Sequence, residues 1–380
     1  MEILEGRKFL VVGAGFYGAV WAHQLASVLG EKVLVIDQRN HIGGNSYTYN
    51  DTQTGIEVHK YGSHIFHTQD KNIWDFINKF TQFNNYRHRV FTSYQEKIYS
   101  MPINLETINS YYKKNFSPSE AKIFMAQEIA KEKILKPKNL EEKAISQIGR
   151  FLYDAFIKGY TEKQWGQKPT VLPESIINRL PVRYNYNAFY FDDPYQGIPL
   201  EGYTTIFKKM LDSPLIEVKL RIDFQQIKNQ IPQDTWVIYS GPIDAYFDYS
   251  EGELGWRTLD FQQEILDLDD FQGNSVMNYA DSAVPFTRIH EFKHYHPEIK
   301  QQNHQTFIMR EYSRQAKKND VPYYPVNTAE DKIILGKYQE KAQELKNIIF
   351  GGRLGSYKYF DMHQVIAQAL IHFSNWSSSH

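Results

Sequence analysis

The stretch FLVVGAGFYG, residues 9–18, decides the fold class of this chain. Its first four residues are apolar and predict a buried strand, and residues 16–29 predict the helix that follows. Between them, Gly13, Gly15 and Gly18 have the GxGxxG spacing of dinucleotide-binding turns. The first glycine permits a tight turn, the second lets backbone approach a pyrophosphate, and the third lets the helix pack on the strand. We therefore predict a nucleotide-binding βαβ unit; an α/β turn that binds nothing is the alternative.

A second buried strand is predicted at residues 33–36, and Asp37 follows it directly. A carboxylate in this place accepts a hydrogen bond from a ribose hydroxyl and disfavours a 2′-phosphate, so NADP is not expected there. The chain continues as DQRNHIGGN, residues 37–45, with an acid, a basic residue and a Gly-Gly pair. In flavoproteins with this opening, such a stretch wraps the second half of FAD, whereas NAD domains usually lack the added glycines. The sequence therefore favours FAD, with a plain surface loop as the alternative.

The composition of the 380 residues is that of an ordinary globular protein with room for two or three domains. A net charge of −1 argues against nucleic acid or an anionic membrane surface as the main partner. The absence of cysteine excludes disulfides, thiolate nucleophiles and cysteine metal sites. No apolar run reaches the length of a membrane span, and the first apolar stretch is too short for a signal peptide. We therefore expect a soluble cytoplasmic protein.

The pattern along the chain predicts an α/β fold: a Rossmann-like FAD-binding domain with a helical insert and an antiparallel β-sheet substrate domain. Apolar residues at helical spacing run from about residue 72 to 156, and alternation from about 256 to 312 indicates the sheet. The expected division is 1–75 for the first part of the FAD-binding domain, 76–165 for the helical domain, 166–200 for a mobile loop and sheet strands, 201–245 for the middle part of the FAD-binding domain, 246–335 for the antiparallel sheet and 336–380 for the C-terminal part of the FAD-binding domain.

Three histidines lie in VHKYGSHIFHT, residues 58–68, at positions 59, 64 and 67. His64 and His67 have no acid or third histidine at helix spacing, so we predict that they hold no metal. A histidine that lies against a flavin ring is a better interpretation. Ordinary core or loop histidines are the alternative.

A loop with two prolines and a glycine, residues 166–176, separates YTEKQWG (160–166) from RLPVR (179–183). Aromatic and arginine side chains that flank a flexible loop are typical of a lid over an anionic, ring-bearing ligand. Salt bridges and packed tyrosines remain the alternative for Arg257, Arg288 and Tyr324. We find no Ser-His-Asp order, HExxH or Walker A pattern, so the cofactor is expected to perform the chemistry.

The stretch GGRLGSYKYFDM, residues 351–362, completes a set that resembles the bacterial UDP-galactopyranose mutases over nearly the whole chain. The stretches FIKGYTEKQWG, RLPVRYNY and GGRLGSYKYFDM are far more specific than GxGxxG. Two residues depart from the family pattern: Ser63 stands where such proteins often have proline, and His88 where they often have asparagine. Both are expected on the flavin side.

The resemblance implies an isomerase that interconverts UDP-galactopyranose and UDP-galactofuranose by covalent catalysis through N5 of reduced FAD, with no net oxidation. It implies catalytic roles for Arg179 and Arg288 at the diphosphate, with Arg179 on the mobile loop, and for His67 beside the flavin. The implied cofactor residues are Gly13, Gly15, Phe16, Gly18, Asp37, Gln38, Gly44, Asn45, His64, Gly352, Arg353, Asp361 and Met362. The implied substrate residues are Tyr160, Thr161, Trp165, Arg179, Tyr190, Arg257, Asn278, Arg288, Tyr324 and Tyr359, among which Tyr190 would stack on uracil.

The resemblance also implies partners: an external flavin reductant such as NAD(P)H, a second copy in a homodimer, and a role in galactofuranose-containing cell-surface polysaccharides. Two other functions stay open at this point. One is a flavin oxidoreductase of the amine-oxidase or desaturase type, and the other is an FAD-containing binding protein without turnover. The arginines and tyrosines directed at a diphosphate argue against an amine or lipid substrate.

Overall fold

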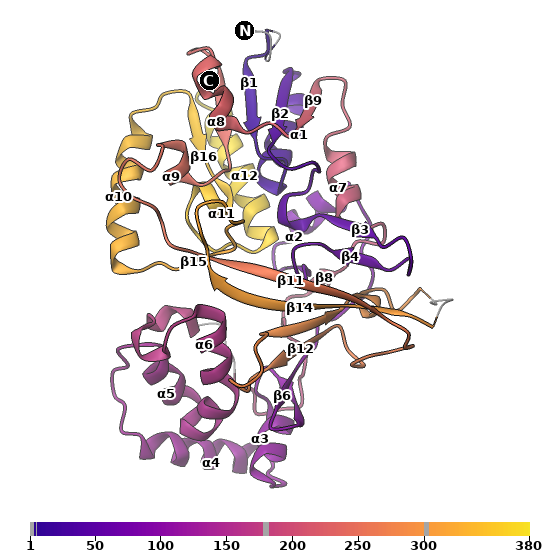
Figure 1. Ribbon diagram of the computed structural model, residues 1–380, viewed down its shortest axis with the longest axis vertical. Coiled ribbons are helices and arrows are strands. Elements are labelled where there is room, and N and C mark those ends of the chain that lie inside the picture. Colours follow the sequence, from indigo (N-terminus) through magenta and orange to yellow (C-terminus); the bar gives the residue numbers. More distant parts are fainter. Residues whose placement is uncertain (1–3, 5, 178–181, 300–303) are drawn as a thin grey trace.

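The computed structural model describes residues 4, 6–177, 182–299 and 304–380. Three parts follow one another along the long axis: a parallel sheet with helices on both faces, a long antiparallel sheet across the middle, and a group of helices at the far end (Figure 1). Both termini lie at the end of the first part. None of the helices in these ranges is long and apolar enough to cross a membrane.

The first part is a parallel sheet of five strands in the order β16-β10-β1-β2-β9. The βαβ unit predicted from the glycine stretch is confirmed as β1, α1 and β2. Residues of β1 and β2 alternate between two buried layers, one under α1 and one on the opposite face, which explains their continuous apolar sequence. The bounds are β1 Phe9–Val12, α1 Phe16–Leu29, β2 Val33–Asp37, β9 Ile216–Leu220, β10 Trp236–Tyr239 and β16 Ile348–Phe350.

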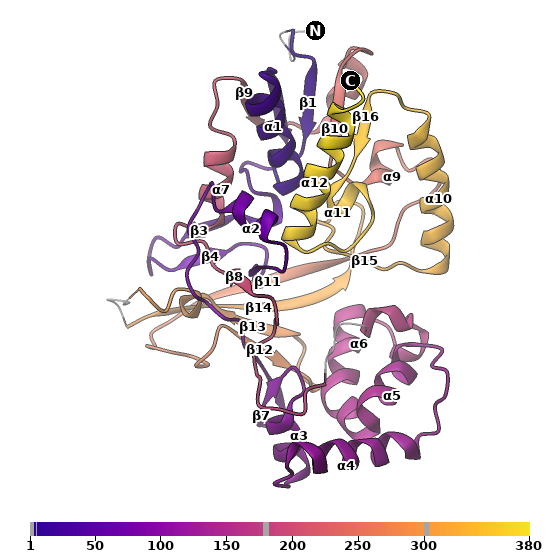
Figure 2. The same cartoon turned by 180° about the vertical axis from the view of Figure 1, so that it is seen from behind.

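Helices from distant parts of the chain cover this sheet. Helix α1 lies beside the C-terminal helix α12 on one face (Figure 2), where Trp21 packs against Phe373 with ring centroids 5.5 Å apart. The short helices α8 and α9 contribute Phe224 and Tyr246 to the other face. The bounds are α2 Lys71–Ile77, α7 Tyr203–Met210, α8 Phe224–Ile227, α9 Ile243–Tyr246, α10 Ala329–Gln343, α11 Gly352–Gly355 and α12 Met362–Ser377.

The second part is a sheet of seven strands in the order β15-β11-β14-β13-β12-β6-β7. All neighbours are antiparallel except β12 and β6, which are parallel. The bounds are β6 Val90–Tyr94, β7 Lys97–Met101, β11 Trp256–Leu266, β12 Val276–Tyr279, β13 Arg288–Glu291, β14 Thr306–Gln315 and β15 Tyr324–Pro325. Two small two-stranded sheets join the parts: β3 (Thr48–Asn50) with β4 (Glu57–His59), and β5 (Phe66–Thr68) with β8 (Tyr195–Gly197).

The sequence pattern predicted a helical domain over residues 76–165. The structure instead has two strands in this range before the helices begin. Strands β6 and β7 form a hairpin inside this range because Gln95 and Glu96 both adopt positive φ, 48° and 59°, and close a two-residue turn. Helices begin only after this hairpin, with α3 at Leu105–Tyr112, α4 at Pro118–Lys131, α5 at Leu140–Leu152 and α6 at Gly159–Trp165. A short π-helical segment, Tyr153–Lys158, connects α5 to α6.

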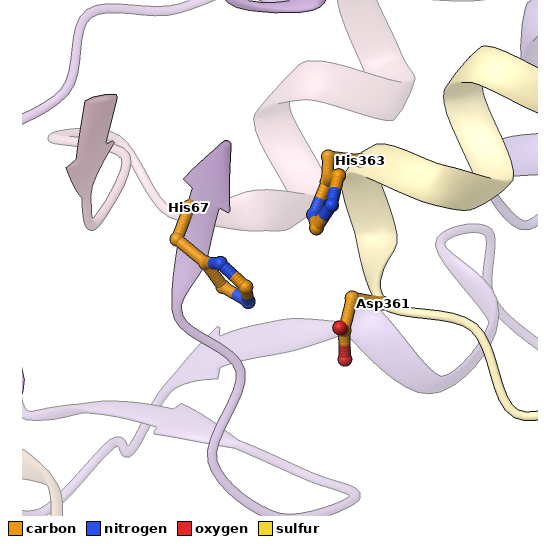
Figure 3. Close-up of side chains that lie close together, drawn as sticks. All are labelled: His67, Asp361 and His363. Atoms are coloured by element: carbon orange, nitrogen blue, oxygen red, sulfur yellow. The ribbon is translucent and has the colours of Figure 1, made fainter. Parts of the chain in front are cut away.

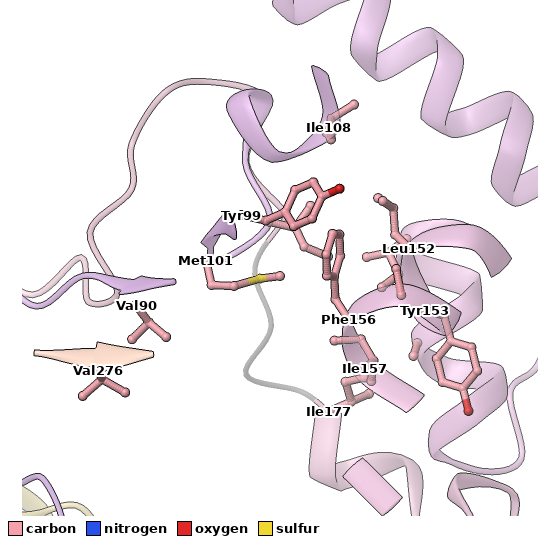
Figure 4. Packing of buried hydrophobic residues seen from close by; sticks show 14 of the residues in the cluster. Val90, Tyr99, Met101, Ile108, Leu152, Tyr153, Phe156, Ile157, Ile177 and Val276 are labelled. Carbon is pink, nitrogen blue, oxygen red and sulfur yellow. The ribbon is translucent and has the colours of Figure 1, made fainter. Parts of the chain in front are cut away.

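The helices and the end of the long sheet share one apolar core (Figure 4). Val90 and Val276 come from neighbouring strands and Leu152 and Phe156 from the helical segment, and all four are buried. Helix α4 has Ser117 as its N-cap, and this side chain forms a capping box with Glu120. This continuous core fixes the helical part against the sheet that carries the candidate site.

The predicted mobile loop begins at Gly166 and packs partly on this core. Leu172 is 2% exposed and its carbonyl accepts a hydrogen bond from the backbone N–H of Leu140 at 2.9 Å. Ile177 is also buried. Arg179, the predicted catalytic residue on this loop, lies outside the described residues, so its role stays a prediction.

Candidate functional site

The glycine turn after β1 leaves no room for side chains. Gly13 has φ of 102°, and a Cβ there would lie 2.1 Å from Oγ of Ser240. A Cβ on Gly18 would lie 2.0 Å from the carbonyl oxygen of Gly13, because α1 packs directly on the turn. Gly15 is the N-cap of α1, so the first N–H groups of this 14-residue helix point out of the turn. The turn lies at the carboxyl end of the sheet, where parallel sheets of this type bind nucleotides.

The second glycine stretch folds back over the first. The backbone N–H of Gly43 donates to the carbonyl of Ala14 at 2.8 Å. Gly44 has φ of 56°, and a Cβ on it would lie 3.1 Å from Cα of Gly15. The two turns therefore form one backbone-lined cradle, which we call the glycine cradle and define as residues 13–18 with 43–45.

Asp37 ties the cradle together at the end of β2. One carboxylate oxygen accepts from the backbone N–H of Ala14 at 2.9 Å and the other from that of Arg39 at 2.9 Å. Each oxygen keeps a second lone pair for a ribose hydroxyl. Asn45 accepts a hydrogen bond from Nη2 of Arg39 at 2.8 Å. Phe16 is buried against Phe207, so its side chain packs in the core and only its backbone faces the cradle.

Asp37, the acid predicted to bind the ribose, can be tested by the variant Asp37→Asn, which should weaken FAD binding about tenfold. This factor corresponds to about 1.4 kcal/mol, the scale of one charge-assisted hydrogen bond. The amide can still accept from one backbone N–H but presents its own N–H groups to the other. Equilibrium dialysis of apoprotein with FAD measures this change, and an unchanged dissociation constant would place the ribose elsewhere.

The predicted flavin-side histidines differ in their surroundings. His59 is fully buried and its Nδ1 accepts from the backbone N–H of His64 at 3.1 Å. Burial lowers the pKa of His64 to about 4. Its Nδ1 donates to the carbonyl of Gly62 at 2.7 Å, which leaves Nε2 of a neutral ring as an acceptor.

His67 lies on β5 and is oriented from two sides. Its Nδ1 lies 2.5 Å from a carboxylate oxygen of Asp193, and its ring stacks on Phe191 with centroids 3.7 Å apart. The Nδ1–H donates to the carboxylate, and these two contacts fix the orientation of the ring. Asp193 was missed by sequence reasoning because it is 126 residues away along the chain.

His67 also meets the start of α12 (Figure 3). Asp361 is the N-cap of this helix and His363 lies in its first turn, with the rings of His67 and His363 4.9 Å apart. One nitrogen or oxygen atom of each of these three side chains lies within 4.8 Å of the others. Two imidazoles and a carboxylate can ligate a divalent cation, so the prediction that the protein holds no metal stays untested. No motif in the sequence singles out His363.

The C-terminal segment closes the same region from the other side. A Cβ on Gly351 would lie 2.0 Å from the ring of Tyr17, so this strand end packs on α1. The backbone N–H of Gly352 donates to Gln368 at 2.8 Å. Arg353 donates to the carbonyl of Phe360 at 2.7 Å and lies over the ring of Tyr359 at 4.7 Å. The segment therefore connects the end of β16 to Met362, where α12 begins.

A row of polar residues crosses the long sheet opposite this segment. Asn278 on β12 pairs with Arg288 on β13, and Arg288 pairs with Glu311 on β14. Nε of Arg288 lies 3.1 Å from a carboxylate oxygen of Glu311, and its Nη2 donates to the hydroxyl of Tyr160 at 2.5 Å. Glu311 is 2% exposed, and although burial opposes ionisation, Arg288 and His290 hold its pKa below the usual range. This geometry fixes a guanidinium at the edge of the site.

A chain of hydrogen bonds connects Arg288 to the flavin-side loop. The second carboxylate oxygen of Glu311 lies 3.1 Å from Nε2 of His290, whose Nδ1 lies 2.5 Å from the hydroxyl of Ser63. Tyr295 donates to the same hydroxyl. Ser63, the residue that departs from the family pattern, thus belongs to a buried polar network. The other departure, His88, has its pKa lowered to about 3 by burial.

Two tyrosines lie on the same side of the site. Tyr324 and Tyr359 stack with ring centroids 5.8 Å apart. Burial raises the pKa of Tyr324, and the nearby Glu311 raises it further. The phenol of Tyr324 therefore remains protonated at neutral pH and can donate a hydrogen bond. Tyr190 is 38% exposed, contacts the ring of His88, and lies close enough to Arg288 and Tyr160 to influence them electrostatically.

Helix α6 brings Tyr160 to this row, while Thr161 is buried and Trp165 packs on the helical core. Arg257, predicted to contact substrate, is 4% exposed and lies under the end of α6. Its Nε donates to the carbonyl of Gln164 at 3.0 Å, and this helix-capping contact engages the guanidinium. A contact between Arg257 and substrate stays a prediction.

The fold and the site define a class: a protein with a Rossmann-like dinucleotide-binding domain joined to a long antiparallel sheet. Residues 155–359 match the family profile of UDP-galactopyranose mutase, and residues 11–80 match that of the NAD(P)-binding Rossmann-like domain. The chain is 43% identical over 368 residues to a probable UDP-galactopyranose mutase of Klebsiella pneumoniae, which covers 97% of this chain and 94% of the relative. The chain therefore belongs to the UDP-galactopyranose mutase family, a family of isomerases.

Two further similarities are informative. The chain is 42% identical over 367 residues to a dTDP-fucopyranose mutase of Escherichia coli, with 96% of each chain covered. The crystal structure of a reduced UDP-galactopyranose mutase matches with a TM-score of 0.75 at 14% identity, covering 98% of this chain and 96% of that one. The structural match shows a shared fold, and the first similarity shows that the family includes more than one named substrate.

Proposed function

We propose that this protein is a UDP-galactopyranose mutase that interconverts UDP-galactopyranose and UDP-galactofuranose with reduced FAD. One observation carries the proposal: the Arg288 guanidinium, held by Glu311 and Tyr160, lies on a row of polar residues whose neighbours include Tyr324. A cation and protonated phenols in one place suit the diphosphate of a sugar nucleotide. The substrate and cofactor residues implied by the family resemblance, matched one by one in this sequence, support the same assignment.

The glycine cradle supports a dinucleotide cofactor. Side chains are excluded at Gly13 and Gly18 by contacts of 2.1 and 2.0 Å, so backbone N–H groups face the place where a pyrophosphate binds. When bound and reduced, FAD supplies the nucleophilic N5 for attack on the anomeric carbon. In this proposal Asp37 holds the ribose, His64 presents a neutral ring nitrogen on the flavin side, and Asp193 orients the ring of His67 there.

The chain's own groups then act on the substrate. Arg288 stabilises the negative charge of the departing diphosphate, and Glu311 keeps the guanidinium in one orientation. Tyr324 and Tyr359 donate hydrogen bonds to phosphate oxygens, and α6 with the loop that follows it keeps water from the reacting carbon. The reductant NAD(P)H, a cytoplasmic location, the homodimer and a role in galactofuranose-containing polysaccharides belong to this proposal through the family resemblance alone.

A second candidate substrate comes from the dTDP-fucopyranose mutase relative, whose identity of 42% is nearly that of the UDP-galactopyranose mutase relative, 43%. Both sugar nucleotides carry the diphosphate that Arg288 and the tyrosines would bind. The test is to reduce the FAD-loaded protein with dithionite and add UDP-galactofuranose or dTDP-fucofuranose in separate reactions. We expect UDP-galactopyranose from the first. Conversion of dTDP-fucofuranose alone would move the assignment to the second substrate, and equal turnover by oxidised protein would contradict a mutase.

The loop at residues 166–177 can be tested by proteolysis, because Glu174 is exposed while Leu172 and Ile177 on either side of it are buried. UDP should slow cleavage after Glu174 by a glutamate-specific protease. Ligand binding that holds this segment closed lowers the population of opened loop. Time courses with and without UDP measure the effect, and a rate unchanged by UDP would contradict a lid role for residues 166–177.

A further inference from the structure

Lys163 on α6 directs all of its donors at one turn of the long sheet. Its Nζ donates to the backbone carbonyls of Tyr279 at 2.7 Å, Asp281 at 2.8 Å and Phe286 at 3.1 Å. These carbonyls belong to the last residue of β12 and to the connection between β12 and β13. An ammonium group has three N–H donors, so the protonated side chain is fully used. None of the roles assigned above includes Lys163.

Gly159 makes a second contact with the same turn, one helical turn before Lys163. A Cβ on Gly159 would lie 2.3 Å from the carbonyl oxygen of Ala280 and 3.2 Å from the backbone nitrogen of Ser282. The backbone of α6 thus lies directly on the turn, because the absence of a side chain allows it. Residues four apart share one face of a helix, so Gly159 and Lys163 form a single contact surface.

The opposite end of α6 is also held. Its last carbonyl groups accept hydrogen bonds from Arg257 and from Ser313, the latter at 2.6 Å to Gln164. A Cβ on Gly166 would lie 2.7 Å from the Arg257 guanidinium. With β11 and β14 fixing its end and the β12–β13 turn fixing its side, α6 has one position relative to the sheet.

The two elements that Lys163 joins carry the two partners of one interaction. Tyr160 lies on α6, and Arg288 is the first residue of β13, directly after the turn. Their 2.5 Å contact therefore depends on where α6 sits against the turn. Asn278 lies at the other end of the turn, on β12.

We propose that Lys163 is a positioning residue that sets the place of Tyr160 relative to Arg288 and Asn278. The inference rests on the proposed function for the roles of these three residues. Loss of the ammonium removes three hydrogen bonds between α6 and the turn, and lets α6 move away from the arginine. A displacement of about 1 Å at such a group costs about 100-fold in rate.

The protonation of Lys163 adds a test. Burial lowers its pKa to about 8, and Asp281 on the turn opposes this shift. Other titratable and charged groups near this face of α6 include Tyr279, whose pKa burial raises, Arg257 at the end of the helix, and the Arg288–Glu311 pair. Between about pH 8 and the usual pKa of lysine the unfolded chain binds more protons than the folded one, so this group's contribution to stability rises with pH. If activity falls above about pH 8 while Tm does not fall, the cause is therefore the hydrogen bonding that Lys163 loses on deprotonation, and not unfolding of the protein.

The experiment compares FAD-loaded, dithionite-reduced wild type with Lys163→Met, Lys163→Arg and Lys158→Met. Lys158 is exposed and precedes α6 directly, so Lys158→Met removes the same charge without the three contacts. We expect kcat/KM for UDP-galactofuranose to fall about 100-fold in Lys163→Met and by less than about twofold in Lys158→Met. Arginine keeps a charge and several donors at all pH values, so Lys163→Arg should recover activity and lack the alkaline fall of the wild type.

Each outcome separates the two proposals. Inactive wild type contradicts the mutase function itself. Active wild type with an equally active Lys163→Met contradicts the positioning role, as does a wild-type profile that stays flat above pH 8. If Lys163→Met does not fold, two measurements on folded proteins decide the question. The activity of the wild type should fall above about pH 8 while its Tm stays unchanged, and Lys163→Arg should show no such fall in activity. Loss of UDP binding, measured by calorimetry in parallel, shows whether α6 serves binding as well as turnover.

Discussion

Arg288→Ala is expected to lower kcat/KM by about 1,000-fold while the purified protein keeps its flavin. The guanidinium is the cation that Glu311 and Tyr160 hold in place, and a preorganised charge of this kind acts on the negative charge that develops as the diphosphate departs. The glycine cradle lies on another element and does not use this side chain. Steady-state kinetics with reduced protein and the ratio of flavin to protein absorbance measure both parts.

The alanine variant has a structural cost as well. Glu311 is 2% exposed, and in this variant it keeps His290 as a neighbour but loses its arginine partner. Removal of one partner from a buried ion pair costs about 3–5 kcal/mol of stability. Arg288→Lys provides the matched control because it keeps a charge near Glu311 but cannot form a guanidinium fork. We expect Arg288→Lys to melt close to wild type and still lose most activity. A colourless Arg288→Ala that folds would instead place Arg288 at the flavin.

Gly18→Ala is expected to abolish FAD binding. A methyl group at this position would lie 2.0 Å from the carbonyl oxygen of Gly13 and 2.8 Å from Cγ1 of Val11. The first contact is to backbone, so α1 must move off β1, and its N-terminal N–H groups leave the cradle. Overpacking of this kind costs about 1–3 kcal/mol or more. A colourless protein with a lowered Tm is the expected result.

Gly30→Ala is the control at the other end of the same helix. Gly30 is the C-cap of α1 with φ of 70°, and a Cβ there would meet no atom within 4 Å. The variant carries only the strain of a left-handed alanine, about 1 kcal/mol, and should bind FAD. A yellow Gly18→Ala, or a colourless Gly30→Ala, would show that packing between α1 and β1 does not shape the cofactor site.

Local patterns in the sequence predicted the parts of the fold that depend on neighbouring residues. The glycines, the two strands and the helix of the βαβ unit lie within 29 residues of one another, so their spacing alone identifies them. The β6–β7 hairpin was wrongly included in a helical range. Its turn uses Gln95 and Glu96 at positive φ, without the Asn-Gly or Gly pair by which such turns are recognised.

A site residue could be singled out from the sequence where its own position in a pattern indicates a role. It could not be singled out where a partner distant in the sequence decides that role. Glu311 and Asp193 are acids that the sequence presents as ordinary, and each becomes significant only beside Arg288 or His67 in the folded chain. For Arg257 the family resemblance implies a substrate contact, which stays a prediction. Its hydrogen bond to the carbonyl of Gln164, 93 residues away, is a contact that the sequence pattern does not indicate.

The cofactor domain has a consequence for how the protein is made. Its central sheet needs β1 from the first residues and β16 from residues 348–350, and α12 must then cover α1. Almost the whole polypeptide must be synthesised before these elements can pack together, so the N-terminal strands of the nascent chain stay exposed through most of translation. Chaperone binding to the growing chain, and loss of soluble protein when synthesis stops before α12, are therefore expected properties of this arrangement.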